Sequence, residues 1–127
     1  MLKTTAMVLM WLLGATPLMA QEADVPVMVG GDSEFSACGG TGKVVGLDPN
    51  GDNFLAVRSG PAAHYEQIDE IHSGDIVFLC DERGPWIGIV YPDGECGVMG
   101  IIEDRQAYAG TCKSGWVYGK YLQDHAG

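Results

Sequence analysis

The residues best able to do chemistry in this sequence of 127 residues are four cysteines, Cys38, Cys80, Cys96 and Cys112. The sequence contains no CxxC pair and no cluster of cysteine with histidine, so the spacing favours disulfides over a zinc site. An even number of cysteines also leaves none over as a free nucleophile. Four cysteines allow three pairings. Because Cys96 and Cys112 bracket a turn-rich segment and would close a hairpin-like loop, we expect the disulfides Cys96–Cys112 and Cys38–Cys80.

The other reactive side chains form no catalytic or metal-binding pattern. His64, His72 and His125 have no ligand spacing with one another, and no GxSxG nucleophile motif occurs. The segment Asp48–Asp52 resembles a calcium loop only faintly, because the glycine and glutamate positions of an EF-hand are not filled. A hairpin turn is the better interpretation of that segment. We therefore expect no catalytic residue, no metal ion and no cofactor.

The net charge of the chain is −10, with 17 acidic and seven basic residues. Binding to nucleic acid depends on lysine and arginine that release counterions from phosphates, and docking on anionic lipids needs the same positive charge. The charge therefore argues against nucleic acid and against an anionic membrane surface as partners. The 19 glycines, about twice the usual share of roughly 7%, favour short strands and many turns.

The first 20 residues have the pattern of a secretory signal peptide. Lys3 supplies a positive start, residues 6–13 are apolar without interruption, and Ala20 is a small residue at the expected cleavage site. An uncleaved membrane anchor is the alternative, but the apolar run is shorter than the roughly 20 residues that a spanning helix needs, and Pro17 interrupts it. Together with the cysteines, this pattern predicts a periplasmic or secreted bacterial protein without membrane insertion after cleavage.

The elements that position these residues are expected to be strands, because no part of the mature chain shows a helical period. Turn signals at 8–12-residue spacing predict an all-β sandwich or barrel. We expect an extended arm over residues 21–40, a small barrel over 41–123 and a loose tail over 124–127. The expected strands cover residues 43–47, 54–57, 66–71, 76–80, 86–91, 97–102 and 115–118.

Three ordered segments carry a resemblance: FLAVRSGPAAHY at 54–65, HSGDIVFLCDERGPWIGIVY at 72–91 and GWVYGKYL at 115–122. Together they resemble the bacterial SH3 (SH3b) domain, which has an L-x-V-R-x-G-P start, a Trp-led strand and a terminal G-W-V-x-x-x-Y-L. The resemblance covers about residues 43–122. The chain departs from the family by inserting residues 93–114 between the Trp-led strand and the terminal strand, with Cys96 and Cys112 near the ends of the insertion.

The resemblance implies an SH3-like β-barrel of five to six short strands that binds peptides, cell-wall stem peptides or protein partners. It also implies a ligand groove between two loops. Tyr65 lies on one loop, Glu82 and Arg83 lie on the facing loop, and Trp86 opens the next strand. Tyr118 is expected as a further groove wall, and those five residues form the predicted site. For Trp86, packing in the core is the alternative to a place in the groove, whereas Trp116 is expected in the core.

Acidic residues are expected near the groove, as either a solvated face or a steering surface for a basic partner. They are Glu66, Asp69, Glu70, Asp75, Asp81 and Glu82.

The predicted function is an exported binding module for a neutral or basic protein or peptide in the cell envelope; an inhibitor or an accessory subunit is one form of such a module. A module that binds peptidoglycan stem peptides is the second choice, because acidic stem carboxylates suit this charge poorly. An enzyme is the third, since it would need a site in the insertion, where no motif supports one.

Overall fold

The computed structural model describes residues 24–125, in which the chain folds into strands and one short 3₁₀ turn without an α-helix. The predicted signal peptide, residues 1–20, lies outside this range. In the described part, no helix is long and apolar enough to cross a membrane. The elements in chain order are β1 (Met28–Val29), β2 (Gly40–Val44), β3 (Leu55–Arg58), β4 (Gln67–Ile71), β5 (Ile76–Arg83), β6 (Trp86–Tyr91), β7 (Gln106–Ala107), β8 (Lys113–Tyr118), η2 (Gly119–Tyr121) and β9 (Leu122–Asp124).

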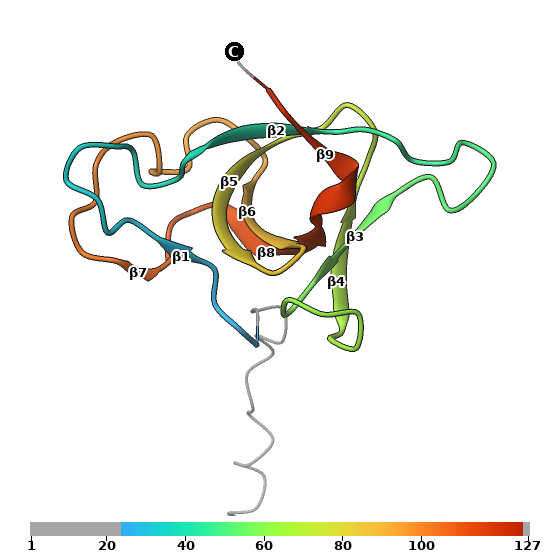
Figure 1. Cartoon of the computed structure of the whole chain (residues 1–127), viewed down its shortest axis with the longest axis horizontal. Coiled ribbons are helices and arrows are strands. Elements are labelled where there is room, and N and C mark those ends of the chain that lie inside the picture. The colour runs from blue at the N-terminus through green and yellow to red at the C-terminus, as the bar shows by residue number, and fades with distance from the viewer. Residues whose placement is uncertain (1–23, 126–127) are drawn as a thin grey trace, which may run out of the picture.

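Seven of the strands form one antiparallel sheet in the order β4-β3-β8-β6-β5-β2-β9, which curves around the core in Figure 1. Strands β1 and β7 form a separate antiparallel pair. Among residues 24–125, the terminal strands β4 and β9 do not pair with each other, so the sheet stays open. The all-β prediction is therefore confirmed, whereas five to six strands was too few.

The additional strands come from segments that the sequence pattern assigned to an arm, an insertion and a tail. β1 lies in the arm and pairs with β7 of the insertion. β9 extends into the predicted loose tail, because residues 122–124 pair with the edge of β2 and the His125 N–H donates to the Thr41 carbonyl. Residues 97–102 are a loop rather than a strand. Gly97 has a φ of +80° there and the next residue, Val98, is buried, which an irregular loop accommodates.

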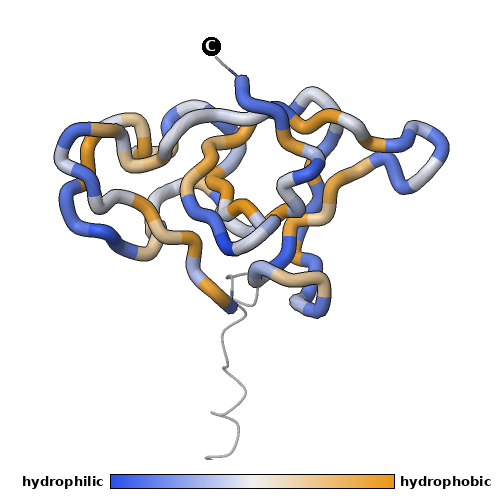
Figure 2. The backbone as a smooth tube through the Cα atoms, viewed as in Figure 1, coloured by the Kyte–Doolittle hydropathy of each residue, from blue (hydrophilic) through white to orange (hydrophobic). Residues whose placement is uncertain are grey.

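Strands β5 and β6 bury side chains on both of their faces. Successive side chains of a strand point to opposite faces of the sheet. Val77 and Ile89 therefore belong to an inner core inside the curved sheet, whereas their neighbours Phe78 and Val90 belong to a second core on the outer face. Figure 2 shows apolar stretches of chain around the centre of the curved sheet and a hydrophilic tip on the loop between β2 and β3.

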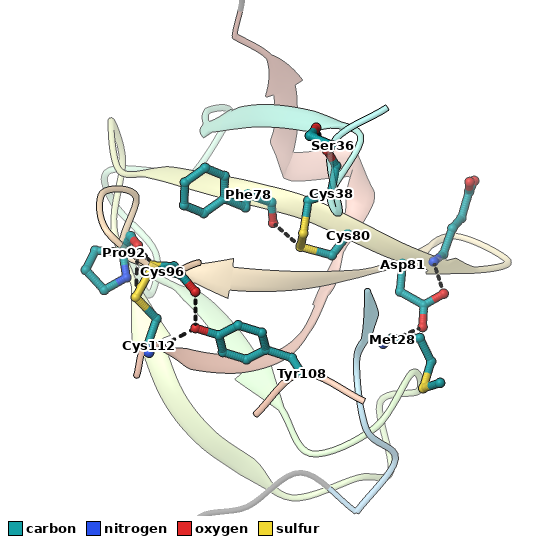
Figure 3. The surroundings of a disulfide bond; sticks show 11 residues. Met28, Ser36, Cys38, Phe78, Cys80, Asp81, Pro92, Cys96, Tyr108 and Cys112 are labelled. Carbon is teal, nitrogen blue, oxygen red and sulfur yellow. Dashed lines mark hydrogen bonds between the residues drawn. A yellow bond between two sulfur atoms is a disulfide. The ribbon is translucent and has the colours of Figure 1, made fainter. Parts of the chain in front are cut away.

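The outer core is covered by what we call the outer lobe, residues 24–39 and 92–112. Two disulfides hold it, Cys38–Cys80 and Cys96–Cys112, and this pairing agrees with the prediction. The ladder between β5 and β6 shifts register between Leu79 and Asp81, so Cys80 lies at an irregularity of the strand. Figure 3 shows the first disulfide joining the lobe to β5 and the second closing the insertion.

Candidate functional site

A groove with a volume of about 530 Å³ lies between the β2–β3 loop and the aromatic residues at the ends of β6 and β8. The lining combines aromatic rings from β6, β8 and the η2 turn with two aspartates of the β2–β3 loop and with residues of β3. The lining residues are Leu47, Asp48, Asp52, Asn53, Phe54, Leu55, Ala56, Arg58, Ala63, Gln67, Trp86, Tyr118 and Tyr121.

The aromatic wall is built by strand pairing. Trp86 and Tyr118 are register partners on β6 and β8, and their rings meet edge to face with centroids 5.5 Å apart. The η2 turn then brings the Tyr121 ring to 6.3 Å from Tyr118. Tyr118 remains 39% exposed although it is a large apolar side chain. The groove thus presents a continuous aromatic surface of which at least one ring is free to contact a ligand.

The β2–β3 loop lines the groove through a tight turn that carries Asp48 and Asp52. The Asn50 N–H donates to Asp48 Oδ1 over 2.8 Å, and the Gly51 N–H donates to the Asp48 carbonyl over 3.0 Å. An aspartate that bonds the backbone two residues on is typical of such turns. The segment is therefore a turn, but the predicted hairpin is wrong, because β2 pairs with β5 and β9 whereas β3 pairs with β4 and β8. Both aspartates line the groove, which therefore holds two acidic residues and one basic residue, Arg58.

Of the five residues predicted for the groove, two line it: Trp86 and Tyr118. Tyr65 lies outside the lining, where its ring stacks on His64 at 4.3 Å. The ring also occupies the space over Gly60, since a Cβ added to Gly60 would lie 2.6 Å from it. The Tyr65 carbonyl accepts a hydrogen bond from Arg58, so this loop is organised around its own contacts.

Glu82 and Arg83 also lie outside the lining, at the end of β5. The Glu82 N–H donates to Asp81, and its own side chain is exposed. The Arg83 guanidinium lies 5.7 Å from the ring centroid of Trp116. Trp116 is fully buried as expected, and its indole N–H donates to the Val25 carbonyl over 2.8 Å. Arg83 therefore covers a core side chain rather than a ligand groove.

The acidic residues expected near the groove are absent from its lining, which takes its negative charge from Asp48 and Asp52 instead. Asp81 is nearly buried, with 5% of its side chain exposed, and it accepts bonds from the Met28 N–H and from Arg105. It ties the two halves of the outer lobe to β5, and Figure 3 shows its bond with Met28.

A second cavity, of about 670 Å³, lies where the outer lobe meets β4, β6 and β8. On its wall the Tyr91 hydroxyl donates to Asp69 over 3.0 Å, and Lys113 lies 3.3 Å from the same carboxylate oxygen. Burial alone raises the pKa of Asp69, but hydrogen bonds from Glu70, Tyr91 and Lys113 outweigh it and leave the pKa below its ordinary value. Burial and the neighbouring carboxylate raise the pKa of Tyr91 above its ordinary range. The pair is thus an ionised acceptor with a neutral donor, an arrangement that joins strands.

Within residues 24–125, no group of three or more histidine, cysteine, aspartate or glutamate side chains is arranged to hold a metal ion. The groove brings together carboxylates, aromatic rings and the Arg58 side chain. The Arg58 guanidinium is engaged by the Tyr65 carbonyl. What these groups can do chemically is hold a ligand by stacking and by charge.

Eleven of the 13 lining residues were not part of the predicted groove, among them Asp48, Asp52 and Tyr121. Tyr121 carried a usable signal, because it follows Tyr118 by three residues and a single 3₁₀ turn places both rings side by side. The two aspartates carried no such signal, since nothing in a turn sequence shows which surface the turn will face.

Comparisons with known proteins give no match: no family model, no curated protein and no solved structure matches this chain.

Proposed function

We propose that this protein is an exported SH3-like binding module that holds a neutral or basic segment of a protein or peptide in the groove between Trp86, Tyr118 and the Asp48–Asp52 turn. The observation that carries the proposal is the composition of this groove. Its lining combines paired aromatic rings with two aspartates around a cavity of about 530 Å³. The module acts by binding rather than by catalysis, as an inhibitor or an accessory subunit in the cell envelope.

The chemistry of the walls supports a basic or neutral ligand. A cationic side chain gains from an aromatic face and from a nearby carboxylate at once. Flat rings with polar edges are also suited to peptide recognition, because they bury much area at little cost in conformational entropy. A ligand carboxylate is disfavoured, because the two aspartates outnumber the single Arg58 guanidinium in the lining.

The SH3-like assignment is part of the proposal and rests on the order of the motif residues along the sheet. Arg58 lies at the end of β3, Trp86 begins β6, and Trp116 lies within β8. We read the curved seven-stranded sheet as a half-open barrel of this type to which the outer lobe has been added. The sheet's antiparallel pairing supports this interpretation.

Export to the periplasm or to the medium is supported by the two disulfides and by the signal-peptide pattern of residues 1–20. Disulfides persist in oxidising compartments, and small exported domains depend on them most. All four cysteines are bridged, which fits such a compartment.

The second candidate is a module that binds peptidoglycan stem peptides, which the bacterial SH3 resemblance favours. The charge of the groove makes it the weaker candidate, because stem peptides carry carboxylates. Co-sedimentation with purified sacculi at low salt separates the two, since retention on sacculi would favour the cell-wall ligand.

The test of the proposed function is a peptide-binding series followed by calorimetry or NMR. Three sets of short apolar peptides are compared, one neutral, one with lysine and one with glutamate. We expect the neutral and lysine sets to bind. Tyr118→Ala should lower their affinity about tenfold, because the groove loses a central aromatic anchor. Tyr65→Ala is the matched control, because it removes an aromatic side chain outside the groove. Equal binding by wild type and Tyr118→Ala, or a preference for the glutamate peptides, would refute the proposal.

A further inference from the structure

Large apolar side chains are exposed on the outer lobe, away from the groove. Four large apolar residues are exposed in the described chain, and three of them lie on the lobe. Phe35 is 67% exposed, Met99 is 73% exposed and Ile101 is 54% exposed. The fourth is Tyr118 of the groove.

The three side chains come from two loops that are bonded to one another. The Ala37 N–H donates to the Gly100 carbonyl over 2.8 Å, which places the loop carrying Phe35 beside the one carrying Met99 and Ile101. The Gly31 N–H donates to the Ile102 carbonyl and extends the contact. Figure 1 shows the two loops side by side at the far end of the lobe. We call these three side chains and their loops the lobe patch.

The lobe patch is held on a rigid support. Behind it Val98, Ala37 and Cys38 are buried in the outer core. The Tyr108 hydroxyl donates to the Cys96 carbonyl and accepts from the Cys112 N–H, which braces the second disulfide from inside (Figure 3). A preorganised surface loses little entropy on binding, and apolar side chains left in water on such a surface are typical of an interaction site.

The rim of the lobe patch is acidic. The exposed carboxylates on the two segments of the lobe around the patch are Asp32, Glu34, Asp93, Glu95, Glu103 and Asp104. The same segments carry one basic residue, Arg105, and its charge is paired with Asp81 at 3.1 Å. A second copy of the chain would bring an equally negative rim, and an anionic bilayer would be repelled.

We propose that the lobe patch docks a protein surface that presents apolar side chains surrounded by lysine or arginine. Apolar contacts would form the buried centre of this interface, and opposite charges at the rim would steer and align the partner. The lobe patch shares no residue with the groove, so its test is independent of the test of the proposed function.

The test uses the disulfide-bonded protein and two synthetic amphipathic helical peptides with the same leucine face, one with lysine and one with glutamate on the polar face. We expect saturable binding of the lysine peptide, with NMR shifts at residues 32–37 and 97–102. The triple variant Phe35→Ser, Met99→Ser, Ile101→Ser should weaken this binding about tenfold or more, since an interface centre is lost. These side chains are exposed, so the variant is expected to keep its fold, which its NMR spectrum verifies.

Two controls separate the patch from the rest of the surface. His64→Ser removes an exposed ring that lies outside both the lobe patch and the groove lining, and it should leave the affinity unchanged. Glu34→Gln with Glu103→Gln should weaken binding several-fold and flatten its salt dependence. The proposal is overturned by absence of saturable binding, by equal affinity for the glutamate peptide, or by shifts confined to the groove. It is also overturned if the triple variant abolishes dimerisation or binding to zwitterionic lipid vesicles instead, because the patch would then belong to another occupant.

Discussion

The inner core and the outer lobe bury opposite faces of the same two strands by different means. On the inner face, the side chains of β5 and β6 pack against those of β2, β3, β4 and β8 in one aliphatic cluster. On the outer face, Phe78 and Val90 are covered by chain with little regular structure, and two disulfides hold that cover. The alternation of side chains along a strand is sufficient to bury a face of the sheet when another part of the sheet packs against that face. When loops pack against it instead, covalent bonds and buried polar contacts must hold the loops in place.

The chain-entropy model gives these bonds a large share of the stability of so small a domain. The Cys38–Cys80 bridge spans 42 residues and the Cys96–Cys112 bridge spans 16. These separations correspond to about 4 and about 3 kcal/mol of loop entropy in the unfolded chain. The longer bridge also attaches the lobe to the sheet, so its removal should separate the two regions most clearly.

Cys38→Ser with Cys80→Ser is therefore expected to have the largest effect. The free energy of unfolding should fall by about 4 kcal/mol, and by about 3 kcal/mol for Cys96→Ser with Cys112→Ser. Denaturant titration measures both, and hydrogen exchange should show the lobe exposed before β3 and β8. Equal exchange in the lobe and the sheet after removal of Cys38–Cys80 would contradict the division into two regions.

A matched pair of core substitutions sharpens the comparison. Val77 and Val90 are both fully buried, one in each core. Each Val→Ala change should cost about 2 kcal/mol in the oxidised protein, because two buried methyl groups are lost. With the disulfides reduced, the cost of Val90→Ala should become small, whereas that of Val77→Ala should persist. Chemical denaturation with and without reductant measures the difference, and parallel losses at both sites would argue for a single core.

Asp81→Ala tests the polar attachment of the lobe. The carboxylate is buried and serves both Met28 and Arg105, so we expect a loss of about 2 kcal/mol from the unsatisfied Met28 N–H and the lost charge-assisted bond. Arg105→Ala is the control. Its side chain is half exposed, and it should cost under about 1 kcal/mol. Thermal unfolding compares the two variants, and equal shifts in Tm would show that the ion pair rather than burial of Asp81 matters.

The smallest effect concerns pH. The pKa of Tyr91 is raised in the folded protein, so above its ordinary value near 10 the unfolded chain loses a proton that the folded chain retains. Stability should therefore fall as pH rises past about 10, and Tyr91→Phe should remove that part of the fall. The pKa of Asp69 is lowered, so its contribution is present above its ordinary value and is lost on acidification. Denaturation midpoints measured across both ranges check the two signs, and Tyr118→Phe is the control for an exposed tyrosine.

Local signals were sufficient for much of the fold. The glycine- and proline-rich turns predicted β3, β4, β5 and β6 to within three residues at either end. The even number of cysteines and the turn-rich loop between Cys96 and Cys112 predicted both disulfides. β9 was missed because it has no signal of its own and forms only against the free edge of β2. β1 and β7 were missed because two residues are too few to show alternation.

The site was less predictable than the fold. Trp86 and Tyr118 were expected together, and register pairing on β6 and β8 does bring their rings together. Tyr65 was expected opposite them. Its ring instead packs over Gly60, in the space that a larger side chain at this position would fill. Whether an exposed loop turns its aromatic residue outward or onto a nearby glycine depends on contacts of a few ångströms that residue types do not reveal.

The sequence by itself determined the all-β class, the turns and the pairing of the cysteines, because each depends on residues close in the chain or on a small number of combinations. Only the tertiary structure decided that β5 and β6 are buried on both faces and that the Asp48–Asp52 turn faces Trp86 and Tyr118. Those outcomes depend on how a twisted sheet curves and on which loop then meets which strand end. The Asp48–Asp52 turn is more than thirty positions from Trp86 and Tyr118, and no local pattern encodes such contacts.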